Sequence, residues 1–85
     1  MLKYILIETE YDVICRTIVC DTMEKAQSKL KKWIEIMQKA MPHTPIWNDE
    51  DMTYAHAKTC PYSAGPWAQI IAVNIPTPQS STSIH

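Results

Sequence analysis

Residues 21–41 read DTMEKAQSKLKKWIEIMQKAM, the one stretch of the chain that is long and regular enough for a long helix. Its apolar residues recur mostly three or four positions apart, so at 100° per residue they share one face. These residues are Met23, Ala26, Leu30, Trp33, Ile34, Met37 and Met41. Asp21 is expected to cap the first free amides, and Glu24 three residues later would complete a capping box. Pro42 ends the helix because proline has no amide hydrogen.

Stretches with the composition of β-strands flank this helix. Residues 2–9 and 13–20 are rich in β-branched and aromatic side chains and predict an antiparallel hairpin. Residues 52–58 (MTYAHAK) alternate large and small side chains, which favours a strand packed closely on its small side, with a short helix as the alternative. Residues 67–75 contain the run IIAV and predict a central strand. The order ββαββ predicts an α+β fold: a four-stranded, mostly antiparallel sheet with one long helix packed on one face.

The length and the loop composition define the domain organisation. Eighty-five residues suffice for one domain, which we assign to residues 1–75. Residues 42–51 contain two prolines and three adjacent acids and are expected to be an ordered loop. Residues 76–85 (PTPQSSTSIH) have the composition of a disordered tail.

The overall composition excludes several classes of protein. The net charge is −1, so no global field would recruit nucleic acid or a membrane surface. No apolar run approaches the roughly 18 residues of a membrane span, and the first residues lack the pattern of a signal peptide. We therefore expect a cytoplasmic protein whose three cysteines stay reduced. A single glycine also argues against a phosphate-binding loop.

Alternation along the strands predicts apolar side chains on both faces of the sheet. In the first strand, Leu2, Tyr4 and Leu6 oppose Ile5 and Ile7. In the second strand, Val13, Cys15 and Val19 oppose Ile14, Arg16 and Ile18. One helix can cover only one of these faces. The other face must meet residues 42–47, a second copy of the chain or a foreign partner; of these we expect the second copy, which makes a homodimer.

The residues that could carry chemistry form no recognisable catalytic or metal motif. The cysteines and histidines lack the two-to-four-residue spacing of zinc ligands, so we expect neither a metal nor a cofactor. Cys60 and His56 could form a nucleophile and base, which keeps a small enzyme or accessory subunit as one alternative. Five lysines on the helix keep a nucleic-acid-binding module as another, although a solvated helix face explains them better.

The densest unexplained cluster combines aromatic and polar side chains in the second half of the chain. Aromatic rings with a polar edge are typical of recognition sites, although they can also close the ends of a small core. The predicted partner-binding residues are Trp47, Tyr54, His56, Lys58, Tyr62 and Trp67. A small nucleotide could stack on Trp47, Tyr54 or Trp67, with Lys58 or Arg16 as the phosphate partner.

The outline of the chain resembles small proteins of bacteriophages and mobile elements. The resemblance lies in the short hairpin, the helix that opens with DTMEKAQ, the acidic loop and the segments EDMTYAHAK and GPWAQIIAV. It implies an inhibitor of a host factor, such as a CRISPR-type or other immune protein, or a protein that sequesters a signalling nucleotide. We therefore expect a small non-enzymatic binding protein, encoded by a phage, that acts in the host cytoplasm on a host protein or a nucleotide.

Overall fold

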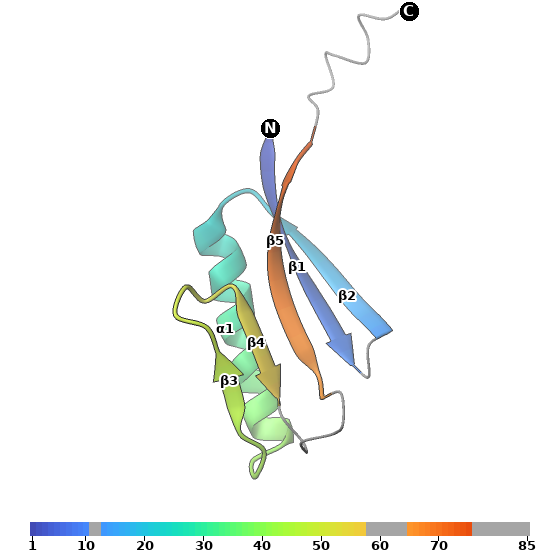
Figure 1. Cartoon of the computed structure of the whole chain (residues 1–85), viewed down its shortest axis with the longest axis vertical. Helices are drawn as coiled ribbons and strands as arrows, with labels where there is room; N and C mark the ends of the chain where they lie inside the picture. The colour runs from blue at the N-terminus through green and yellow to red at the C-terminus, as the bar shows by residue number, and fades with distance from the viewer. Residues whose placement is uncertain (11–12, 58–64, 76–85) are drawn as a thin grey trace, which may run out of the picture.

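The fold is a single antiparallel sheet with one helix across one face (Figure 1). A computed structural model describes residues 1–10, 13–57 and 65–75. The elements in chain order are β1 (Leu2–Glu10), β2 (Val13–Cys20), α1 (Met23–Ala40), β3 (Ile46–Asn48), β4 (Tyr54–Ala57) and β5 (Trp67–Asn74). The strands lie in the order β2-β1-β5-β4-β3, and each neighbouring pair is antiparallel. The predicted hairpin and the single long helix are confirmed, as is the central place of the last strand.

The prediction of four strands in the order ββαββ is wrong by one strand. The order is ββαβββ, because Ile46–Asn48 pairs with Ala57, His56 and Ala55 of β4 inside the segment expected to be a loop. Three residues directly after Pro45 are too short for alternation to be recognised. Residues 52–58 do contain the expected strand, which spans Tyr54–Ala57 among the described residues. The predicted tail, residues 76–85, lies outside the described residues.

The N-terminus of α1 differs from the prediction by one residue. Thr22 is the N-cap, and its hydroxyl accepts a hydrogen bond from the Lys25 amide at 3.2 Å. Asp21 instead pairs with the ammonium of Lys3 on β1, an exposed contact that ties the start of the helix to the sheet. The expected capping box between Asp21 and Glu24 is therefore wrong, since a threonine can satisfy the same amides.

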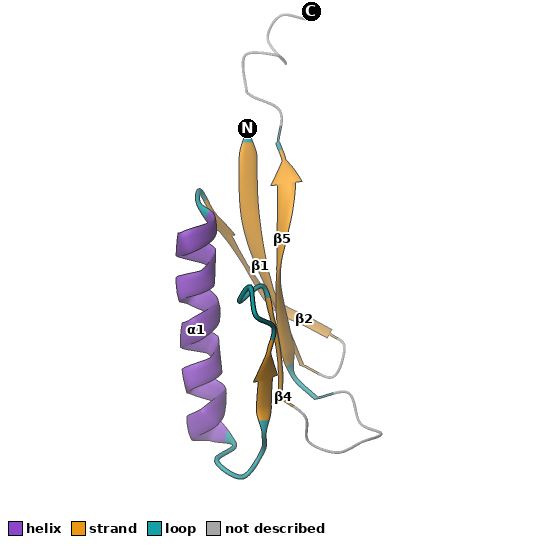
Figure 2. Cartoon of the chain, turned by 60° about the vertical axis from the view of Figure 1, so that its left-hand side comes forward, coloured by secondary structure: helices purple, strands orange, loops and turns teal. Residues whose placement is uncertain are grey.

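The core lies between α1 and the sheet face on which Leu6 and Ile70 are paired. Leu30 is fully buried and Trp33 nearly so. The prediction that β4 packs closely on the side of its small residues is confirmed. Ala55 and Ala57 are fully buried, as are Ala68 on β5 and Ala26 on the helix. Alanine side chains allow the helix and sheet backbones to approach closely, and the larger residues fill the remaining space. Figure 2 shows α1 lying along this face only.

A β-bulge in the hairpin changes the predicted faces of β2. The register between β1 and β2 shifts between Glu8 and Thr9, so Ile14 lies opposite Thr9 and Cys15 has no opposite residue in the pairing. Strict alternation predicts that Ile14 and Ile18 share a face, but the bulge places them on opposite faces. Cys15 has no partner in the register, and it lines a cavity together with Trp33 of the helix.

Residues 42–47 do not fold across the sheet face that α1 leaves open. Residues 41–45 turn from the end of α1 to β3, with a hydrogen bond from the Thr44 amide to the Met41 carbonyl. The residues that follow enter the sheet as its edge strand (Figure 1). The interpretation in which this loop covers the second face is therefore wrong.

Replacing Leu30 tests the core. Leu30→Ala should lower the free energy of unfolding by about 2–5 kcal/mol, because a fully buried leucine leaves a cavity when truncated. Urea denaturation followed by far-UV circular dichroism measures this change. The control is Ser28→Ala on the exposed side of the same helix, which should stay within about 0.5 kcal/mol. An unchanged midpoint for Leu30→Ala would contradict the assigned core.

Candidate functional site

The sheet face opposite α1, here called the open face, is the candidate functional site. The strand registers place one set of side chains on it. Its members are Lys3, Ile5, Ile7, Thr9, Ile14, Thr17, Val19, Trp47, Tyr54, His56, Trp67, Gln69, Ile71 and Val73. Lys3 is the one lysine, arginine or acid in this set, and its ammonium is paired with Asp21. The open face is therefore apolar and almost free of charge.

Four of the predicted site residues meet on β3, β4 and β5. The ring of Tyr54 lies at the centre, with centroid distances of 5.8 Å to Trp47, 6.4 Å to His56 and 6.1 Å to Trp67. Cross-strand pairing of His56 with both tryptophans produces this arrangement. All three ring pairs are tilted, a geometry that aromatic quadrupoles favour. The outer ring, Trp47, is 57% exposed, so the cluster presents an apolar surface to its surroundings.

The β3–β4 turn fixes the position of two of these rings. The Asp49 carboxylate accepts hydrogen bonds from the Thr53 amide at 2.7 Å, the Tyr54 amide at 3.0 Å and the Thr53 hydroxyl. Met52 takes a left-handed φ of 55°, and its amide donates to the Asp49 carbonyl. Such a φ costs a non-glycine residue about 1–2 kcal/mol, which these contacts offset. Asp49, one of the three adjacent acids in the predicted ordered loop, thus organises the hairpin that carries Trp47 and Tyr54.

An aliphatic patch shares the open face with the aromatic cluster, toward the other edge of the sheet. Ile71 of β5 lies opposite Ile5 of β1, which lies opposite Val19 of β2. Ile71 is 36% exposed and Val19 is 59% exposed. Between this patch and Trp67 lies one row of paired residues, Gln69, Ile7 and Thr17, so the two apolar groups share a face but are separated by a partly polar row. Sequence reasoning found the aromatic cluster, and strand alternation indicated the aliphatic patch.

Two predicted site residues, Lys58 and Tyr62, lie outside the described residues. Arg16, considered as a phosphate partner, is not near the aromatic cluster. It lies on β2 at the opposite edge of the sheet, and its guanidinium donates to the Glu8 carboxylate at 2.8 Å. That hydrogen bond and the charge of Glu8 raise the pKa of Arg16 above its ordinary value.

The described residues offer little for metal or thiol chemistry. Within residues 1–10, 13–57 and 65–75, no group of three histidine, cysteine or acidic side chains is arranged to hold a metal ion. Cys15 and Cys20 are free thiols, the first exposed and the second buried. Cys60, the predicted nucleophile of the enzyme alternative, falls outside this part of the chain.

One cavity of about 260 Å³ lies between the end of α1 and the hairpin, on the side away from the open face. Trp33, Met37 and Met41 line it from the helix, and Glu8 and Cys15 line it from the strands. Its lining is mainly apolar, and Glu8 is already paired with Arg16. Across the described part of the chain, α1 does not reach the apolar length of a membrane-spanning helix.

Comparison with protein-family models, with curated proteins and with solved structures finds no match to this chain. The geometry of the described residues therefore carries the functional argument.

The turn at Asp49 can be tested by substitution and by pH. Partial desolvation acts to raise the pKa of Asp49, but its hydrogen bonds to Thr53 and Tyr54 outweigh this and lower it. The stabilisation is therefore complete above the ordinary aspartate pKa of about 3.9 and is lost as pH falls through the lowered value. Asp49→Ala should cost about 1–2 kcal/mol in urea unfolding at neutral pH, and less near pH 2.

The neighbouring exposed acid supplies the control for this experiment. Glu50→Gln removes a charge from the same turn, and no hydrogen bond of the Glu50 side chain holds the hairpin. Its unfolding free energy should stay within about 0.5 kcal/mol of the wild type. Equal losses for the two variants at neutral pH would show that Asp49 acts only through its charge.

Proposed function

We propose that this chain is a non-enzymatic binding protein that acts through the open face, and that a second copy of the chain is its first partner there. One observation carries the proposal: the aromatic cluster and the aliphatic patch lie on the same uncovered face, whose single lysine is itself paired. Large exposed apolar surfaces of this kind generally mark interaction sites.

A second copy suits this face for two physical reasons. A twofold interface uses the same patch twice, and a face without unpaired charge can meet itself without burying like charges. Sheets packed face to face form a core from interdigitated side chains, and Ile5, Val19 and Ile71 are side chains suited to it. Each Å² of apolar surface that such packing removes from water contributes roughly 25 cal/mol. The predicted homodimer is therefore part of this proposal.

Three other functions receive less support from the described residues. The nucleotide hypothesis needs a cation beside the stacked rings; Arg16 lies at the far edge of the sheet, and Lys58 lies outside the described residues. The enzyme hypothesis needs Cys60 near His56, whose ring lies in the aromatic cluster beside Tyr54. The nucleic-acid hypothesis rests on the lysines of α1, the helix that packs on the other face of the sheet from the open face. A blocking role against a host factor, which the resemblance to phage proteins implies, stays a prediction.

The mass of the protein in solution tests the proposal. At micromolar concentration, light scattering should give about twice 9.8 kDa for the wild type. Ile71→Glu should give 9.8 kDa, because it places a charge at the middle of the open face, on the central strand.

Ile36→Glu is the matched control. Ile36 is an exposed isoleucine on α1, away from the open face, so the same change there should leave the dimer intact. A monomeric wild type, or a dimer that survives Ile71→Glu and dissociates with Ile36→Glu, would contradict the proposed interface.

A further inference from the structure

The outer edge of β2 is the longest unpaired strand edge in the described part of the chain. β2 has eight residues and pairs with β1 on one side, and no described strand pairs with its other side. The opposite edge of the sheet, β3, has only three residues. Val13, Ile14 and Val19 on β2 are 65%, 61% and 59% exposed, among the largest values for big apolar residues here. A long, apolar edge of this kind can accept a further strand.

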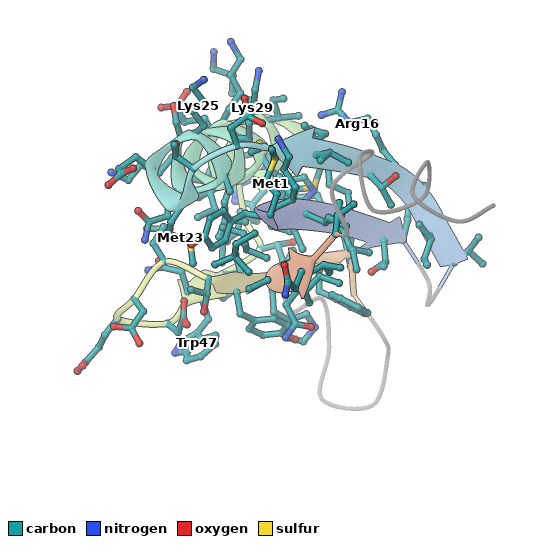
Figure 3. All side chains as sticks on the ribbon, turned by 90° about the horizontal axis from the view of Figure 1, so that it is seen from above. Met1, Arg16, Met23, Lys25, Lys29 and Trp47 are labelled. Carbon is teal, nitrogen blue, oxygen red and sulfur yellow. The ribbon has the colours of Figure 1, made fainter. Side chains whose placement is uncertain are left out.

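One flank of α1 overhangs this edge. On the other flank, the Gln27 side chain donates to the Asp51 carbonyl at 2.8 Å, which fixes that side of the helix toward the β3–β4 turn. Lys25, Lys29 and Lys32 lie roughly 140–200° away from Gln27 around the helix, so they face the β2 side. Figure 3 shows Lys25 and Lys29 on the same side of the molecule as Arg16, with Trp47 on the opposite side.

The charges along this edge are predominantly basic. Lys25, Lys29 and Lys32 are exposed, and none of the three is in an ion pair within the described residues. Of the acids nearby, Glu8 is paired with Arg16 and Asp21 with Lys3, and Glu10 lies opposite Val13 at one end of the edge. The side of the β2 edge that α1 overhangs is therefore positive, and the other side presents Ile14, Thr17 and Val19 of the open face.

We propose that the β2 edge binds an extended acidic segment of another protein, which adds to the sheet as a sixth strand. Backbone hydrogen bonds to β2 would supply affinity, as in other cases of strand addition. Side chains of the added strand alternate between the faces, so acids at every second position would reach Lys25, Lys29 and Lys32. The intervening residues would be β-branched and would pack beside Thr17 and Val19. This inference does not depend on what the open face binds.

The same charges disfavour two other occupants of this edge. Two copies of β2 paired antiparallel are related by an axis perpendicular to the sheet, which places both helices on one side with their lysine flanks facing each other. Nucleic acid would satisfy the lysines but would leave the apolar edge and its backbone groups without partners. An acidic strand would pair with the lysines and would also cover the apolar edge and its backbone groups.

A synthetic peptide tests the proposal. The probe is an eight-residue peptide of alternating Glu and Val, matched to the length of β2 and labelled with fluorescein. Fluorescence anisotropy at low salt should show saturable binding. Lys29→Glu should weaken it roughly 3- to 10-fold, because the reversed charge repels the acids. Lys31→Glu makes the same change about 160° further round the helix from Lys29 and should leave the affinity unchanged.

Hydrogen exchange separates strand addition from simple attraction between charges. On peptide binding, backbone amides within residues 16–20 of β2 should exchange more slowly, since the outward-facing ones gain hydrogen bonds. A peptide of the same composition with its glutamates in one block should bind more weakly. The proposal is overturned by equal weakening from the two lysine variants, by unchanged exchange in β2, or by tighter binding of a single-stranded oligonucleotide on this flank.

Discussion

A single helix can cover one face of a sheet, and this limit governs the structure. The helix lies close to β4 and β5 because Ala26, Ala55 and Ala68 are small and fully buried, and Leu6, Leu30 and Trp33 fill the remaining space. Every strand carries apolar residues on this side. Because β1 and β5 carry large aliphatic side chains on both faces, the packing that forms the core also leaves an apolar surface with no described element over it. The candidate site is thus a direct consequence of the fold.

The parts of the fold with strong periodicity could be predicted from the sequence. The helical stripe centred on Leu30 and Trp33 and the large–small alternation of Tyr54–Ala57 each specify an element and its buried side. The predictions were wrong at positions where a single residue decides the local backbone geometry. Thr22 rather than Asp21 caps the helix, and the bulge at Cys15 reverses the expected face of Ile14. Three residues of β3 become a strand through pairing with β4, which no pattern within them reveals.

The candidate site was predictable in its residue types more than in its arrangement. Tyrosine, tryptophan and histidine in the second half of the chain indicated a recognition surface, and the sheet register brings four of them together. The role of Asp49 as the residue that holds the β3–β4 turn depends on hydrogen bonds to Thr53 and Tyr54, which sequence spacing alone does not specify. The molecule thus presents two different surfaces. The open face is apolar and nearly uncharged, whereas the β2 edge lies beneath a basic helix flank.

Hydroxyl-radical footprinting at two protein concentrations tests the central claim most directly, that the open face is an interface and the helix face a core. Trp47 is 57% exposed and Trp33 is 5% exposed, so they report on the two faces. At nanomolar concentration Trp47 should be oxidised readily, and at tens of micromolar it should become protected as two open faces meet. Trp33 should be protected at both concentrations. Equal oxidation of Trp47 at the two concentrations, or oxidation of Trp33 as fast as that of Trp47, would contradict the account.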